Sequence, residues 1–291
     1  NCDGEIDEDN ICEILKLSSP NKNIYSERRI PFNITLKKLV DEITYIDLND
    51  DRPRERTLCR GCEGYGNDRA RFQSFSDGLH NLTFKAIIDD KIVDEENVLF
   101  RVDTKSPRIS RTEPRRGFVN GIFNVEFVEE NPTQLVLFYG NSTRNHSLNI
   151  ENECNLDRKR YKCKTEVNLS DFDGKEIQYW FNLTDIIGNM DSSRPISLDV
   201  DTTKPILNYF NYSIDGRRVE FIFNVTELNF NEINYIDLND TRQREIRLCS
   251  KLRDGICEVR KSFRNGDHNL TINILDDAGN FEKVSIQFTI I

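Results

Sequence analysis

The sequence predicts an all-β protein made of three similar β-sandwich domains in a row. Residues 42–50 (EITYIDLND) recur almost unchanged at residues 232–240 (EINYIDLND), and weaker echoes between the two copies indicate a repeat of about 95 residues. Apolar and polar residues alternate in short runs, which is typical of half-buried strands. Helical periodicity is nearly absent. A repeat of this length holds about seven strands, enough for two packed antiparallel sheets.

The strand prediction is firmest where the alternation is cleanest. In these runs every second residue is apolar, and the polar residue between two of them points to the opposite face of the sheet. The runs are residues 30–36, 82–86, 219–225 and 270–274.

Recurring strand ends divide the chain into a short N-terminal segment and three domains. We expect an acidic, cysteine-flanked loop over residues 1–12 and sandwich domains over residues 13–105, 106–203 and 204–291. The junctions between domains are very short and end in Pro107 and Pro205. Because proline fixes its own φ angle, such junctions act as stiff hinges. We therefore expect the domains to form a rod.

Composition limits the kind of partner. The net charge is -10, charged residues make up 31% of the chain, and the pI is near 5.0. A sequence-independent grip on nucleic acid or anionic lipid is disfavoured by this charge. No apolar run approaches the roughly 18 residues that cross a bilayer, and the first residues do not resemble a signal peptide.

The eight cysteines predict disulfide bonds and an oxidising compartment. They fall into close pairs, one before the first domain and one within each domain: Cys2 and Cys12, Cys59 and Cys62, Cys154 and Cys163, and Cys249 and Cys257. Eight cysteines allow 105 connectivities, but corresponding pairs in three repeats favour pairing within each repeat. The alternative at Cys59 and Cys62 is redox or zinc chemistry, for which a lone pair supplies only half of a zinc site.

Asn-X-Ser/Thr sequons also indicate an exported protein that carries N-linked glycans. There are ten, well above the roughly three expected by chance. An asparagine-rich composition is the alternative explanation. The sequon asparagines are Asn33, Asn81, Asn141, Asn145, Asn168, Asn182, Asn211, Asn224, Asn239 and Asn269.

Two motifs carry a resemblance to a known family. Residues 276–280 (DDAGN) and 185–189 (DIIGN) match a Gly-Asn turn between the last two strands, and the junctions at 103–107 (DTKSP) and 201–205 (DTTKP) match the start of a following domain. In these features the chain is similar to the tandem Ig-like domains of prokaryotic, particularly archaeal, cell-surface proteins, over about 95% of its length. The resemblance implies Ig-like sandwiches that act as scaffolding in surface layers, filaments, adhesins or exported enzymes.

The first domain departs from that family pattern, because Asp89 and Asp90 stand where Gly-Asn is expected. Antibody-type domains match poorly, since their disulfide joins distant cysteines across the two sheets. The pairs in this chain are local, and we expect them to staple a hairpin in the middle of each domain.

The N-terminal loop is a candidate calcium site. Five carboxylates lie between its two cysteines, and so many negative charges repel one another unless a cation neutralises them. The loop resembles the calcium loops of extracellular repeat proteins but lacks the order of an EF-hand, so a solvated acidic tail is the alternative. The candidate ligands are Asp3, Glu5, Asp7, Glu8 and Asp9.

Nothing in the sequence predicts an enzyme. Of the three histidines, His80 and His268 occupy matching positions before Asn-Leu-Thr, which favours a structural role, and His146 is expected in a polar loop beside a sequon. No catalytic triad, metal-binding histidine pair or phosphate-binding glycine loop is present.

Two surfaces are candidates for contact with other copies of the chain. Trp180, the single tryptophan, is expected on the outer face of its strand, either as an interface anchor or covered by its own domain. The last strand is apolar, and we expect it to pair with a neighbouring copy through Ile286, Phe288 and Ile290.

Together these observations predict an extracellular, glycosylated, disulfide-stapled structural subunit of a cell-surface filament or surface layer. Its expected partners are other copies of itself, other surface proteins or glycans. An adhesin or carbohydrate-binding protein, and the accessory domains of a larger surface enzyme, are the alternatives, because fold alone does not select among these roles.

Overall fold

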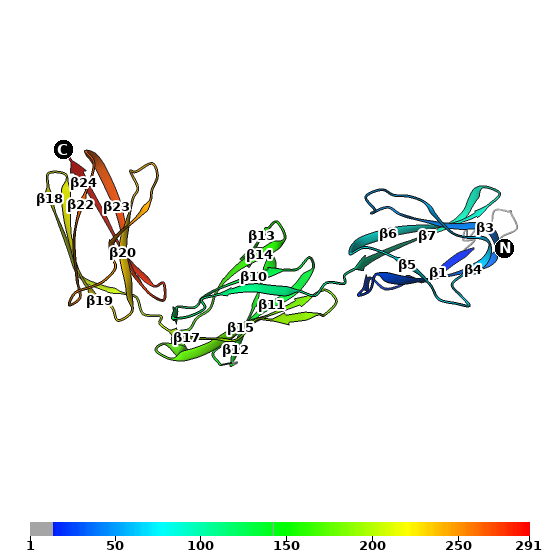
Figure 1. Ribbon diagram of the computed structural model, residues 1–291, viewed down its shortest axis with the longest axis horizontal. Coiled ribbons are helices and arrows are strands. Elements are labelled where there is room, and N and C mark those ends of the chain that lie inside the picture. Colours follow the sequence, from blue (N-terminus) through cyan, green and yellow to red (C-terminus); the bar gives the residue numbers. More distant parts are fainter. Residues whose placement is uncertain (1–13, 142) are drawn as a thin grey trace, which may run out of the picture. The chain divides into compact units, whose positions relative to one another are not determined.

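The computed structural model describes residues 14–141 and 143–291 (Figure 1). Nearly all of its regular structure is β-strand, which confirms the predicted all-β class. The chain divides after Ser106 into two compact units. The first unit contains one hydrophobic core and the second contains two, so the described residues form three tandem Ig-like sandwiches.

The first domain is built around one long strand that serves both of its layers. The first part of β3 pairs with β1 and β5, and its last part pairs with β6. β4 runs beside both parts, and a large bulge between Thr35 and Val40 separates them. The elements are β1 (Leu15–Ser19), β2 (Ile24–Tyr25), β3 (Arg29–Asp47), β4 (Arg56–Tyr65), β5 (Arg71–Ser74), β6 (Gly78–Ile88) and β7 (Lys91–Val102).

The second domain has two separate sheets. One has the order β13-β14-β10-β8, and the other has the order β12-β11-β15-β17-β9 with β16 beside β15. The elements are β8 (Arg108–Glu113), β9 (Phe118–Val119), β10 (Ile122–Val128), β11 (Pro132–Tyr139), β12 (Arg144–Leu148), α1 (Ile150–Glu153), β13 (Cys154–Asp157), β14 (Arg160–Glu166), the 3₁₀ turn η1 (Ser170–Phe172), β15 (Glu176–Asp185), β16 (Met190–Ser192) and β17 (Ile196–Val200).

The third domain packs a three-stranded sheet, β18-β19-β22, against a four-stranded sheet, β21-β20-β23-β24. Its elements are β18 (Ile206–Asp215), β19 (Arg218–Thr226), β20 (Phe230–Asp237), β21 (Glu245–Cys249), β22 (Ile256–Ser262), β23 (Gly266–Asp276) and β24 (Phe281–Ile290).

The predicted alternation of faces is confirmed in the central strands. Val219, Phe221 and Phe223 of β19 are completely buried. Asn224, which lies between the buried Phe223 and Val225, is half-exposed. The same pattern holds along β6, β15 and β23. Each inner face therefore supplies the core, and each outer face remains in contact with water.

Strand pairing is antiparallel, as predicted, apart from two short parallel pairs. β2 pairs in parallel with β7, and β9 pairs in parallel with β17. In the first two domains the first strand pairs with one neighbour, β3 or β10, and the short second strand then pairs with the last strand of the domain. Two-residue pairings of this kind are too short to show a period in the sequence.

The recurring Asp-X-X-Gly-Asn sequence closes the last hairpin of the third domain through its aspartate. Asp276 Oδ1 accepts a hydrogen bond of 2.8 Å from the Asn280 amide, and Gly279 between them adopts φ +89°. The first domain reaches a tight turn differently, because Asp89 and Asp90 themselves adopt positive φ angles of 48° and 58°. Aspartate is one of the few residues other than glycine that tolerate this region.

The disulfides within the described residues are local, but only one staples a hairpin. Cys154 and Cys163 are directly opposed on β13 and β14. Cys59 and Cys62 instead lie on the single strand β4. The third bond, between Cys249 and Cys257, joins β21 to β22, which belong to different sheets. The expectation of a hairpin staple in every domain is therefore wrong for the first domain, where both cysteines lie on one strand. It is also wrong for the third, because sequence spacing alone does not show where the chain crosses between sheets.

Replacing Cys154 and Cys163 by serine should lower the free energy of unfolding of the second domain by about 2 to 3 kcal/mol, through the larger entropy of the opened unfolded chain. Denaturant unfolding of the full chain measures this loss. The matched control is the double serine variant at Cys59 and Cys62, which should cost less because a sequence separation of 3 closes a smaller loop than one of 9. Equal losses would contradict the entropic explanation.

Candidate functional sites

A histidine–aspartate pair lies in the third domain. His268 Nδ1 is 2.5 Å from Asp237 Oδ2, and its Nε2 is 2.9 Å from the carbonyl oxygen of Arg264. The imidazole ring packs between Phe263 and Phe288, with ring centroids 5.0 and 5.2 Å away. The pair therefore joins β20 to β23 at the edge of the core.

The first domain repeats the arrangement. His80 Nδ1 is 2.6 Å from Asp47 Oδ2, and Nε2 is 2.9 Å from the carbonyl oxygen of Ser76. Phe75 and Phe100 enclose the ring at 4.9 and 5.4 Å. Sequence reasoning identified the two histidines but not their aspartates, although both aspartates lie inside the copied segments at residues 42–50 and 232–240.

Both ring nitrogens of each histidine face an oxygen acceptor, so neither nitrogen is left to act as a general base or a metal ligand. Burial lowers the pKa of His268, but the Arg264 carbonyl and the Asp237 carboxylate together raise it above its ordinary value. Strand register places Ile177 and Tyr139 at the corresponding positions of the second domain. The first and the third domain thus each contain such a pair, which links two strands of the same domain through polar contacts.

Three carboxylates converge where the second domain ends and the third begins. Ligand atoms of Asp201, Glu227 and Asp276 all lie within 4.8 Å of one another. Asn229 Nδ2 donates to Asp201 Oδ2 at 2.9 Å, and Asn280 Nδ2 donates both to Asp276 Oδ2 and to the carbonyl oxygen of Asp201. Within residues 14–141 and 143–291, this is the one group of three such side chains close enough to share an ion. We call it the junction cluster.

The negative charges of the three carboxylates in the junction cluster repel one another. Burial raises the pKa of Glu227, and the negative charges of Asp201 and Asp276 raise it further. Burial also raises the pKa of Asp276, against the hydrogen bonds that it accepts from Asn280. Three oxygen ligands suit a hard divalent cation such as Ca²⁺ or Mg²⁺, which would neutralise this repulsion.

Sequence reasoning did not bring the junction cluster together. Its members lie far apart in the chain, and Asp201 and Asp276 were each noted for other motifs. A signal was nevertheless present, because each member has a counterpart of the same residue type one repeat earlier: Asp103, Glu129 and Asp185.

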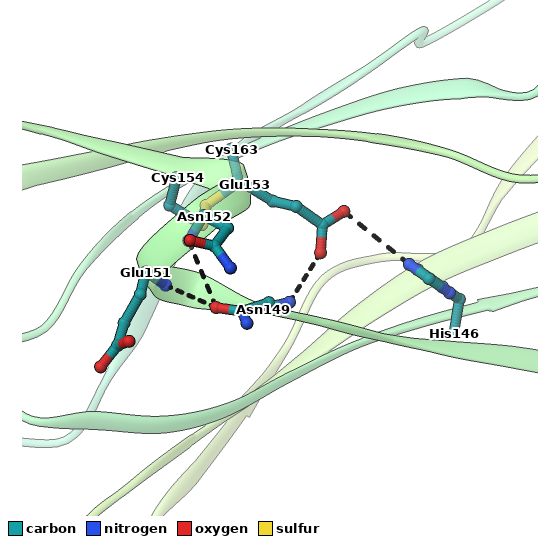
Figure 2. Close-up of a disulfide and its surroundings, with 7 residues drawn as sticks. All are labelled: His146, Asn149, Glu151, Asn152, Glu153, Cys154 and Cys163. Atoms are coloured by element: carbon teal, nitrogen blue, oxygen red, sulfur yellow. Dashed lines mark hydrogen bonds and ion pairs between the residues drawn. A yellow bond between two sulfur atoms is a disulfide. The ribbon is translucent and has the colours of Figure 1, made fainter.

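A small hydrogen-bonded helix cap lies beside the disulfide of the second domain (Figure 2). Asn149 is the N-cap of α1, and its own amide donates to Glu153 Oε2 at 2.6 Å. The other carboxylate oxygen of Glu153 lies 3.8 Å from His146 Nε2. His146 lies on β12 and is half-buried, so its surroundings are those of a local structural contact.

None of the ten sequon asparagines is buried. Those on central strands are half-exposed, as the alternation predicts, and the others are exposed. The half-exposed group is Asn33, Asn81, Asn182, Asn224 and Asn269; the exposed group is Asn141, Asn145, Asn168, Asn211 and Asn239. Each sequon asparagine is thus at least partly exposed, and occupancy by a glycan stays a prediction.

Trp180 lies on the outer face of β15, as predicted. Its strand neighbours Tyr179 and Phe181 are completely buried, whereas Trp180 is half-buried. The indole ring stacks on Phe138 of β11, with centroids 5.3 Å apart and planes 8° apart. The outer face of this sheet therefore carries an aromatic platform made of Phe138 and Trp180.

The last strand belongs to its own domain. β24 pairs antiparallel with β23 from Phe281 to Ile290. Phe288 and Ile290 are 8% and 2% exposed and form part of the third core, with Ile286 packed against it. These side chains are thus used within their own domain, and pairing of the strand with another copy stays a prediction. The backbone edge of β24 opposite β23 is unpaired within the described residues.

The predicted calcium ligands Asp3, Glu5, Asp7, Glu8 and Asp9, and the pair Cys2 and Cys12, lie outside the described residues and stay predictions. No helix in the described part of the chain is long and apolar enough to span a bilayer.

No protein-family model matches the chain, and no curated protein matches it. Among solved structures, the FN1–FN3 domains of chicken CNTN1 align over 95% of this chain and 97% of their own, at 11% identity and a TM-score of 0.44. A tetra-tandem repeat from the extending region of a large adhesion protein covers 95% and 73%, at 12% identity and 0.38. A three-domain fragment of the titin I-band covers 92% and 94%, at 12% identity and 0.32. At such values the fold assignment rests on the sheets and cores of the chain itself.

The stability of the third domain should depend on pH through His268. Because its folded pKa is raised, its contribution is complete below the unfolded value of about 6.5 and is lost as the pH rises through the folded pKa. Thermal melts of the full chain at a series of pH values, with an NMR titration of the histidine rings, measure this. His268→Gln should flatten the decline, while the control His146→Gln should leave it unchanged. A decline that persists in His268→Gln would assign it to another group.

Neutralising one member of the junction cluster should raise thermal stability when no divalent cation is present. Glu227→Gln removes repulsion from two neighbouring carboxylates, and the gain should be greater at pH 7 than at pH 4, where protonation of Glu227 already relieves the repulsion. Calorimetry in chelator measures the effect. If the three carboxylates bind a cation, Glu227→Gln should lower thermal stability once Ca²⁺ is added. If Glu227→Gln lowers stability in chelator as well, repulsion among the carboxylates is not what limits stability.

Proposed function

We propose that the chain is a non-catalytic structural segment of an extracellular cell-surface assembly, either a filament or a surface layer. The observation that carries this proposal is the division between faces. The inner faces of the strands hold three cores, while all ten sequon asparagines remain accessible on the outside. Local disulfides in each domain support an oxidising compartment.

The proposed role is mechanical. Each sandwich is closed by its own core, so one domain can persist while its neighbour is disturbed. Side-chain hydrogen bonds of the junction cluster join the end of the second domain to turns of the third, through Asn229 and Asn280. Such contacts would limit the freedom of a short linker. Glycans on the outer faces would keep sheet edges from pairing at random.

Assembly requires a surface that recognises another copy, and the unpaired sheet edges are the candidates. In the third domain β18 and β24 each have a strand on one side only. Exposed backbone donors and acceptors on such an edge can pair with a strand of another chain. Edge pairing between copies is therefore the mode of self-association that we propose.

Two measurements test the proposal. Peptide mass spectrometry of the native protein should show disulfide-bonded cysteines and glycan-modified sequons, and electron microscopy should show polymers or sheets. Free thiols with unmodified asparagines would overturn the extracellular assignment. Native, glycosylated material that stays monomeric at every concentration would overturn the structural role while leaving the compartment intact.

A further inference from the structure

Sequon Asn182 lies beside the aromatic platform of the second domain. Trp180 and Asn182 are two positions apart on β15, so their side chains share the outer face at a spacing of roughly 7 Å. Across the sheet, Phe138 is the register partner of Trp180, and Val136 is the register partner of Asn182. The asparagine therefore borders a half-buried apolar surface of its own domain.

The orientation of the Asn182 amide suits modification. Its Oδ1 atom is buried and has no hydrogen-bond partner within the described residues, although the residue as a whole is half-exposed. Nδ2 is the atom to which an N-linked sugar is attached. With Oδ1 directed inward, Nδ2 is the amide atom left on the solvent side.

We propose that Asn182 carries an N-linked glycan whose first sugar packs over the Phe138–Trp180 platform. This inference rests on the glycosylation included in the proposed function and adds a specific contact to it. A pyranose ring has a face of C–H groups with partial positive charge, and the faces of aromatic rings are partially negative. Stacking of the two also removes apolar ring surface from water.

The positions of the sequons favour the chain's own glycan over another occupant of the platform. Asn145 of β12 is the register partner of Phe138 on its other side, so two sequons flank the aromatic pair. A sugar at either position would obstruct a protein partner that approached the platform directly. A sugar tethered two residues from Trp180, in contrast, pays little of the entropy cost of reaching it.

A second sequon provides an internal control. Asn269 also lies on the outer face of a long central strand, β23, but Asp267 stands two residues before it and Gln287 is its register partner. Leu238 lies on its other side, so a glycan there meets polar and aliphatic side chains and lacks an aromatic surface on which to stack.

Because Trp180 is the single tryptophan, intrinsic tryptophan fluorescence reports on this site alone. The protein is produced in glycosylated form as wild type, Thr184→Val, which removes the sequon of Asn182, and Thr184→Ser, which keeps it. Quenching by acrylamide should increase several-fold in Thr184→Val, and its melting temperature should fall by roughly 3 to 6 °C. Thr184→Ser should match wild type, and Thr271→Val, which removes the sequon of Asn269, should leave quenching unchanged.

A double-mutant cycle separates stacking from any other effect of the sugar. In a Trp180→Ala background, Thr184→Val should cost little further stability, because the surface on which the sugar packs is gone. An equal loss in both backgrounds would overturn the proposal. Protection of Trp180 that depends on protein concentration and not on the sequon would instead assign the platform to a second copy.

Mass spectrometry distinguishes failure of this inference from failure of the proposed function. An unmodified Asn182 on a protein whose other sequons carry glycans overturns only the inference. Unmodified asparagines at all ten sequons overturn the inference, and together with free thiols they overturn the proposed function as well.

Discussion

Packing of two sheets through one face of each strand is the constraint on which the rest of the structure depends. The core residues of β19, β15 and β23 are completely buried at alternate positions, and burial of this apolar surface is the main force that holds the sheets together. Once the inner faces are committed to the cores, any recognition, modification or cation binding must use outer faces, turns and domain junctions. The sequons, the aromatic platform and the junction cluster are found in those places.

The fold class could be predicted from the sequence, because one-sided burial makes apolar and polar residues alternate along each strand. In runs such as residues 219–225, the apolar residues at every second position show which side of the strand faces the core. Features that depend on where the chain crosses from one sheet to the other could not be predicted from the sequence. The bond between Cys249 and Cys257 has almost the same spacing as that between Cys154 and Cys163, yet only the latter joins neighbouring strands of one sheet.

Side-chain clusters were the hardest features to predict, since their members are distant in sequence. His268 and Asp237 meet because β20 and β23 are hydrogen-bonded neighbours, and that pairing is a property of the folded sheet. The outward position of Trp180 was predictable from alternation, but its stacking on Phe138 required the register of β11 against β15. Local patterns therefore predict which face a residue occupies, and only the topology shows which residues share that face.

The short span of the disulfides also determines how far each domain could lengthen under load. A bond shields from extension only the residues that it encloses, and the three described bonds have sequence separations of 3, 9 and 8. An unravelled domain of about 95 residues could therefore release most of a contour length of roughly 300 Å. A disulfide between distant strands would keep most of the residues that it encloses from extending, and so would shorten the released length. A tether made of such modules would absorb a sudden pull by yielding one domain at a time, with its covalent bonds intact.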